Sequence, residues 1–384
     1  MRRLIGVVVG FLLGLGLSAA TAYAGAITPY SQTNLVSDLS GVAAVMDPNL
    51  KNPWGVSESS SSPLWTSDQA AHAATLYTIH DSTATQAGGP LVVSIPAPGP
   101  TGTVNNANTS SFIITQTGSP AFAHFIFANL NGGIYAWAAA PNPAQLEVMT
   151  AGASYTGLAI NHAQNQLYAA NNVVGGGIDV FNSSFGFVTT IATPSAISSR
   201  NLVPFNVQDI NGMVYVTYAL PGHTAETTAG AGEGAVAIFS EAGVLQSILI
   251  NSPTSQLASP WGIALAPSNF GPFSDDLLIG NFAYGNVNGI VNPVGGEINA
   301  FNPSTGAFLE TLDSNTAWQG LWALTFGNGG NGGDPDILYF TTGLNSETDG
   351  LLAALAVPEP SGLALLGTAL ALFTVRRWRA RRQA

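Results

Sequence analysis

Residues 259–312 decide the fold, and their sequence is SPWGIALAPSNFGPFSDDLLIGNFAYGNVNGIVNPVGGEINAFNPSTGAFLETL. Four short runs in this stretch have the composition of β-strands, at 260–265, 276–281, 296–301 and 307–312. Gly, Pro, Asn and Asp, which favour turns, separate the runs. Four short strands joined by turns over roughly 50 residues are typical of one antiparallel blade of a β-propeller.

This unit recurs along the chain. An aromatic residue opens it in four places, at Trp54, Phe205, Trp261 and Trp322. Two further units lie within residues 123–137 and 157–191. The sequence therefore predicts an all-β protein whose residues 25–356 form a β-propeller of six blades. Seven blades is the alternative, because residues 112–114 could begin another blade.

The two ends of this domain are expected to meet in one blade. The last unit, residues 321–355, has three strand-like runs where the clearest units have four. Residues 31–38 form another such run and have no partner nearby in the sequence. Because an open ring would leave a strand edge free to aggregate, we expect residues 31–38 to supply the missing strand and to close the ring.

Charge is distributed unevenly. Seven of the nine basic residues lie in the terminal segments, which leaves Lys51 and Arg200 against 20 of the 21 acidic residues. A body so poor in cations cannot neutralise phosphates, so nucleic acid is excluded as a partner. Cations or neutral glycans are better suited than nucleic acid as binding partners of this acidic domain. The chain has no Cys, which excludes disulfides, thiol catalysis and thiolate metal sites.

Residues 1–24 have the organisation of a secretory signal peptide. Arg2 and Arg3 precede an apolar run at residues 4–17, and Ala22 and Ala24 form a small-x-small cleavage site. The apolar run is shorter than the ~20 residues that span a membrane as a helix. We therefore expect export through the Sec translocon followed by cleavage, rather than a permanent first membrane helix.

Residues 357–384 fall into three parts, in which the motif Pro358-Glu359-Pro360 precedes an apolar segment and a cluster of arginines. The apolar segment covers residues 362–375, and the cluster includes Arg376, Arg377 and Arg379. Prolines disfavour helix before the apolar segment, and arginines hold its end on the cytoplasmic side. This tail resembles the PEP-CTERM sorting signal of exosortase-processed bacterial proteins. The resemblance implies a transient stay in the inner membrane, cleavage near the motif, and release to the cell surface or the medium. A permanent single-span anchor is the alternative.

Three segments of the body, residues 34–38, 47–55 and 332–340, carry a second resemblance. On the basis of these segments, the chain from about residue 30 to residue 355 resembles a family of uncharacterised exported bacterial β-propeller proteins. This resemblance implies the fold. It implies no activity, because no activity is assigned to the members of this family.

Polar residues near the starts of strands are the candidates for a ligand site in the central funnel. They are Asn52, His124, Asn206, Asp209 and Gln319. Oxygen ligands of this kind suit Ca²⁺, but few carboxylates are among them, so no cofactor is indicated and Ca²⁺ is the alternative. The four aromatic residues that open units are expected to pack between neighbouring blades. A stacking platform in the funnel is the other interpretation.

The five histidines have no metal-binding spacing, and the chain has no G-x-S-x-G motif. No catalytic residue is predicted. The sequence favours a non-catalytic binding or structural module of the cell envelope or of the extracellular polysaccharide matrix. The alternative is a metal-dependent, lactonase-like hydrolase with its site in the funnel.

Overall fold

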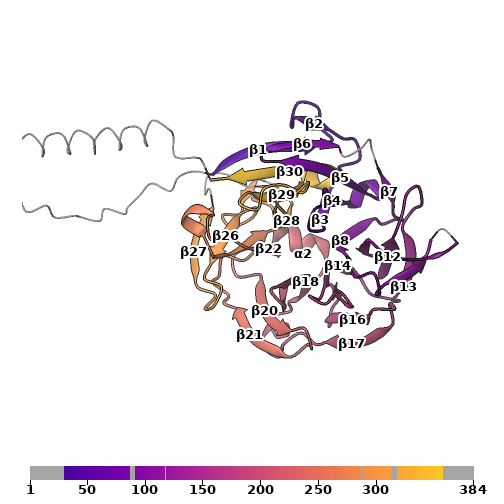
Figure 1. Cartoon of the computed structure of the whole chain (residues 1–384). Helices are drawn as coiled ribbons and strands as arrows, with labels where there is room; N and C mark the ends of the chain where they lie inside the picture. Colours follow the sequence, from indigo (N-terminus) through magenta and orange to yellow (C-terminus); the bar gives the residue numbers. More distant parts are fainter. Residues whose placement is uncertain (1–29, 87–90, 117, 288, 313–317, 358–384) are drawn as a thin grey trace, which may run out of the picture.

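The computed structural model describes residues 30–86, 91–116, 118–287, 289–312 and 318–357. Six sheets surround a central axis as the blades of a propeller (Figure 1). The prediction of an all-β propeller with six blades is confirmed. Strands β3, β8, β14, β18, β22 and β28, one from each blade, lie closest to the axis (Figure 1).

The first three blades follow the chain. Blade 1 contains β3 (Pro53–Ser57), β4 (Leu64–Asp68), β5 (Ala73–His80), β6 (Thr83–Gln86) and β7 (Val93–Ser94). Blade 2 contains β8 (Pro100–Asn105), β11 (Phe125–Asn129), β12 (Gly133–Trp137) and β13 (Gln145–Met149). Blade 3 contains β14 (Tyr155–Ile160), β15 (Gln166–Asn171), β16 (Ile178–Asn182) and β17 (Phe187–Ile191).

The other three blades complete the ring. Blade 4 contains β18 (Val203–Ile210), β19 (Met213–Ala219), β20 (Ala235–Ser240) and β21 (Leu245–Ile250). Blade 5 contains β22 (Pro260–Leu265), β23 (Leu277–Asn281), β26 (Ile298–Phe301) and β27 (Phe308–Leu312). Blade 6 contains β28 (Leu321–Phe326), β29 (Leu338–Gly343), β30 (Asp349–Ala356), β1 (Ser31–Ser37) and β2 (Val45–Met46).

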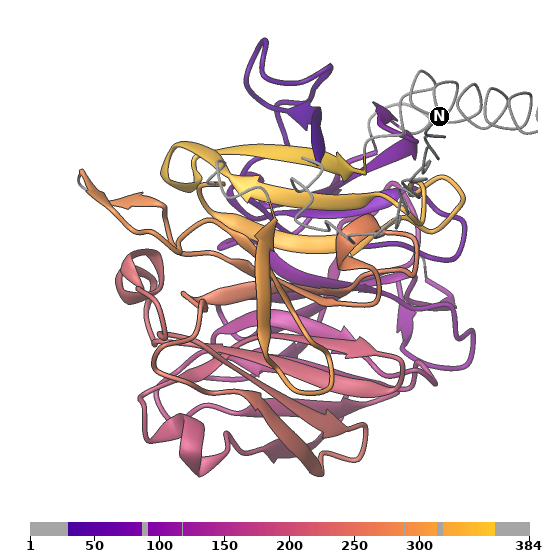
Figure 2. The same cartoon turned by 90° about the vertical axis from the view of Figure 1, so that its left-hand side faces the viewer.

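Short elements lie outside the blades. They are the hairpins β9 (Ile113–Thr115) with β10 (Pro120–Phe122) and β24 (Asn286–Val287) with β25 (Ile290–Val291), and the short helices α1 (Ser195–Ser198), α2 (His223–Thr228), α3 (Leu344–Glu347), η1 (Gln69–Ala71) and η2 (Gly271–Phe273). Figure 2, turned by 90°, shows α2 and the β24–β25 hairpin on the same face of the ring. The Tyr284 amide donates to the Thr227 carbonyl at 3.0 Å and ties the end of α2 to this face.

The N-terminal strand closes the ring, as expected from the strand count. β1 pairs antiparallel with β30, from Ser31 opposite Ala356 to Ser37 opposite Leu351. Leu35 and Val36 of β1 are buried in the apolar layer between blades 6 and 1. The same blade therefore holds both ends of the domain.

The seven-blade alternative is wrong, and the sequence did not indicate the inner strand of blade 2. Residues 112–114 do not begin a blade, since β9 pairs only with β10 in a two-stranded sheet. The innermost strand of blade 2 is β8, whose sequence PTGTVN lacks an apolar run. In blade 1 the outer edge consists of β6 and the two-residue β7, which both pair with β5.

Apolar side chains fill the space between neighbouring blades. Within the described residues, a separate buried cluster lies at each of the six blade–blade contacts. A seventh cluster of aromatic side chains crosses the axis. Trp54 stacks on Trp322 with ring centroids 3.7 Å apart, and Phe205 lies 6.0 Å from Trp322. Phe205 and Trp322 belong to blades 4 and 6, which are not neighbours. The aromatic residues are thus buried, but they reach each other across the channel rather than only between adjacent blades.

The signal peptide expected at residues 1–24 and the sorting tail, apart from Val357, lie outside the described residues. In the part of the chain that is described, no helix is long and apolar enough to cross a membrane.

Candidate functional site

The aromatic cluster divides the central channel into two cavities. The axial cavity, of about 270 Å³, is lined by the inner strands beyond the aromatic residues. The mouth cavity, of about 450 Å³, lies at the other end, where Trp54 lines it together with residues of α2 and α3. Figure 1 shows α2 over the centre of the ring. The two cavities differ in the chemistry that they present.

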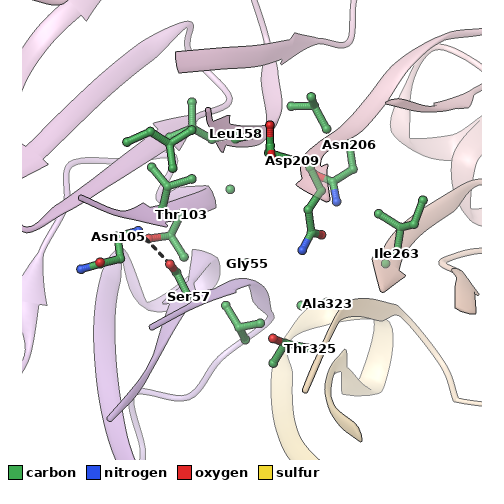
Figure 3. A pocket seen from close by; sticks show the side chains of 18 of the residues that line it. Gly55, Ser57, Thr103, Asn105, Leu158, Asn206, Asp209, Ile263, Ala323 and Thr325 are labelled. Atoms are coloured by element: carbon green, nitrogen blue, oxygen red, sulfur yellow. Dashed lines mark hydrogen bonds between the residues drawn. The ribbon is translucent and has the colours of Figure 1, made fainter. Parts of the chain in front are cut away.

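Residues from the inner strands of all six blades line the axial cavity (Figure 3). Ser57 Oγ accepts a hydrogen bond from the Asn105 amide at 2.8 Å. Asp209 Oδ1 accepts from the Gly212 amide at 2.9 Å. Burial raises the pKa of Asp209 to about 6, and the neighbouring Glu241 contributes to this increase. The cavity therefore offers two carboxyl groups, those of Asp209 and Glu58, and burial raises the pKa of Glu58 to about 8.

A His–Glu pair dominates the mouth cavity. His223, the first residue of α2, places Nε2 2.7 Å from Glu347 Oε2 and Nδ1 3.9 Å from Glu226 Oε2. The hydrogen bond with Glu347 is the main cause that raises the pKa of His223. The interaction joins two connections that are distant in sequence, one from blade 4 and one from blade 6.

Glu347 is held by several partners on an unusual backbone. Its Oε2 accepts a hydrogen bond from the Tyr284 hydroxyl at 3.1 Å, and its Oε1 accepts one from Asn52 Nδ2 at 3.3 Å. Residues 345–347 all have positive φ, at 50°, 56° and 67°. Non-glycine residues pay an energetic penalty in this region, which is tolerated where the surroundings fix it, often at functional sites.

Asn52 connects the mouth cavity to the aromatic cluster. Its Oδ1 accepts a hydrogen bond from Trp322 Nε1 at 2.8 Å, and its Nδ2 also donates to Gln69 Oε1 at 3.0 Å. Gln69 Nε2 in turn donates to the Pro98 carbonyl at 2.6 Å. With both ends of its amide engaged, Asn52 has a fixed orientation at the cavity wall.

Two buried polar atoms at the mouth cavity have no partner among the described residues, Trp54 Nε1 and Glu226 Oε1. Trp54 is 4% exposed and Glu226 is 3% exposed. Burial raises the pKa of Glu226 to about 7, while the charge of His223 acts in the opposite direction. Both residues line the cavity, and a ligand that supplied an acceptor and a donor would satisfy these two buried atoms.

The residues predicted for a funnel site are not brought together. Asn52 lines the mouth cavity, and Asn206 and Asp209 line the axial cavity. His124 and Gln319 line neither. His124 packs against Phe122, with ring centroids 4.3 Å apart, and burial lowers its pKa. Within the described residues, no group of three or more His, Asp or Glu side chains is arranged to hold a metal ion.

Sequence reasoning missed the mouth cavity because its polar residues come from connections, not from strands. His223 and Glu226 lie in the segment between β19 and β20, and Glu347 lies between β29 and β30. One signal was available. The β19–β20 connection spans residues 220–234, which is far longer than a hairpin needs, and long connections often carry function.

No protein-family model matches the chain, and no curated protein is significantly similar to it.

Proposed function

We propose that the protein is an exported, non-catalytic β-propeller that binds a hydroxyl-rich ligand, such as a unit of an extracellular polysaccharide, in its mouth cavity. One observation carries the proposal: Trp54 Nε1 and Glu226 Oε1 are buried beside the cavity without partners among the described residues. Hydroxyl groups both donate and accept hydrogen bonds, so one sugar unit supplies what both atoms lack.

Composition and cavity chemistry support the same ligand class. The amides of Asn52, Gln69 and Asn172 line the cavity beside the indole of Trp54. Cavities with a few placed polar groups around an aromatic side chain are typical of small-molecule sites. Two bases against 20 acids between residues 27 and 356 disfavour polyanions, nucleic acid included.

A pair of cavity-filling substitutions tests the location of the site. Ser154→Trp places a large ring in the mouth cavity, and Thr325→Trp does so in the axial cavity; both positions are partly exposed. We expect Ser154→Trp to abolish binding to polysaccharide purified from the producing cells, and Thr325→Trp to retain it. The reverse result would place the ligand in the axial cavity and overturn the proposed site.

The non-catalytic part of the proposal has its own test. Turnover of small esters or lactones by the purified protein, lost on addition of a Ca²⁺ chelator, would replace it with the lactonase-like alternative. A ligand that binds only the folded state raises stability. A melting temperature that falls in chelator would therefore also count for a bound metal ion.

Export and processing follow from the two ends of the sequence. Residues 1–24 support Sec-dependent export, and Pro358-Glu359-Pro360 with the following apolar segment and arginines supports recognition by an exosortase-type protease. We expect mass spectrometry of the mature protein to show loss of everything beyond the Pro-Glu-Pro region. A mature C-terminus at Ala384 in cells that contain an exosortase would refute the processing.

A further inference from the structure

The charged groups of the mouth cavity do not balance. Glu226 and Glu347 both lie beside His223, and no Lys or Arg is among the described residues that line the cavity. With His223 protonated and both carboxyl groups ionised, two negative charges face one positive charge. One monovalent cation would complete the site.

Glu226 is the less fully paired of the two carboxylates. Glu347 is paired with His223 and accepts hydrogen bonds from Tyr284 and Asn52. Glu226 approaches His223 only to 3.9 Å, and its Oε1 has no hydrogen-bond partner in the described part of the chain. The groups that act on it are His223, Glu347 and the amide of Asn172. A buried carboxylate in this position is stabilised by a proton or by a cation.

Trp54 Nε1 requires the opposite kind of partner. An indole N–H only donates, so the ligand must also carry an acceptor oxygen. A ligand that satisfies both atoms therefore combines a cationic donor with neutral oxygen atoms.

We propose that the mouth cavity selects a sugar unit with a free primary amine, whose ammonium group pairs with Glu226 while a sugar oxygen accepts a hydrogen bond from Trp54 Nε1. This inference rests on the proposed function and specifies the ligand within it. Hydrogen bonds between ionised groups are roughly twice as strong as neutral ones. Removing the charge of the ligand is therefore expected to weaken binding about tenfold.

Two trisaccharides test the inference, the glucosamine trimer and its fully N-acetylated counterpart. Acetylation removes the charge of each amine and keeps the ring hydroxyls. By calorimetry on the purified protein near neutral pH, we expect the glucosamine trimer to bind about tenfold more tightly. Glu226→Gln should reduce this preference to about twofold or less. Glu147→Gln, on β13 and outside the mouth cavity, is the matched control and should keep the full preference.

A second measurement needs no variant. At pH 6 the amine carries its proton, and Glu226, whose pKa burial raises to about 7, is mostly protonated. Binding of the ammonium group then expels the proton of Glu226, so the measured enthalpy should change with the ionisation enthalpy of the buffer. An enthalpy that is independent of the buffer would contradict the pairing.

The outcomes separate the two proposals. Equal binding of both trimers overturns the amine selectivity and leaves a hydroxyl-rich ligand in place. A preference that survives Glu226→Gln also overturns it, because the charge would then be recognised elsewhere. Failure of both trimers to bind counts against the proposed ligand class itself, and the selectivity falls with it.

Discussion

At Glu226 a carboxyl group is held where water scarcely reaches it. The residue is 3% exposed, and burial raises its pKa from about 4.5 to about 7. Between these two pH values the folded chain keeps the proton that the unfolded chain has lost. Folding is therefore favoured by this group below about pH 4.5, and the contribution is lost as the pH rises through about 7.

Glu226→Gln should remove this pH dependence. A neutral amide resembles the protonated carboxyl group, so we expect nearly equal stability at pH 4.5 and a gain of roughly 3 kcal/mol at pH 8. Urea unfolding at both pH values measures it, with Glu310→Gln on the exposed face of β27 as the control that should change neither. A variant that is less stable than the parent at pH 8 would mean that ionised Glu226 has a stabilising partner.

At the scale of elements, close contact between successive inner strands narrows the channel. Five of the six inner strands have Gly or Ala at an equivalent position, in the series Gly55, Gly102, Gly157, Gly262 and Ala323, and blade 4 has Asn206 there. A Cβ atom on Gly55 would lie 2.6 Å from the Thr101 carbonyl oxygen, and one on Gly262 would lie 2.4 Å from that of Trp322. The neighbouring strand leaves no room for a side chain there, because its main chain occupies the space.

Gly102→Ala tests this packing. The new Cβ atom would lie 2.2 Å from the Leu158 amide nitrogen and 2.7 Å from the Gly157 carbonyl carbon, both main-chain atoms. Because main chain cannot move aside as a side chain does, we expect a loss of about 3 kcal/mol in the free energy of unfolding. Gly230→Ala is the control, since its nearest atom is the end of the Glu233 side chain at 3.8 Å. Equal stability of the two variants would show that blades 2 and 3 can separate at this level.

These elements also show how far the sequence could predict the structure. Apolar runs bounded by turn residues identified blades 3 to 6, and counting strands identified β1 as the closing strand. β8 was missed because it is buried by close main-chain contact, and its Thr101-Gly102-Thr103 core has no apolar pattern. The mouth cavity was missed because only the ring brings His223 and Glu347 to 2.7 Å. The alternation of apolar and polar residues predicts strands, whereas the residues of this site lie in the connections between strands.

At the scale of the whole molecule, one strand pairing holds the ring closed. Ser37 Oγ donates to the Gly350 carbonyl at 2.7 Å, and Asp38 accepts from the Gly350 amide at 2.9 Å. Lys51 lies 2.7 Å from the buried Asp38 carboxylate and 3.6 Å from that of Asp349. One of the two basic residues of the body thus neutralises acidic groups where the ends of the domain meet.

Deletion of residues 31–37 tests this closure. It would expose the edge of β30 and the apolar layer that Leu35 and Val36 cover, so we expect aggregation at concentrations where the parent stays monomeric. The control replaces the peripheral β24–β25 hairpin, residues 286–291, with two glycines, and size-exclusion chromatography compares all three proteins. A synthetic SQTNLVS peptide should restore the monomer in the deletion variant, because it can pair with β30 as β1 does. A deletion variant that is monomeric and as heat-stable as the parent would show that contacts between blades suffice to keep the ring closed.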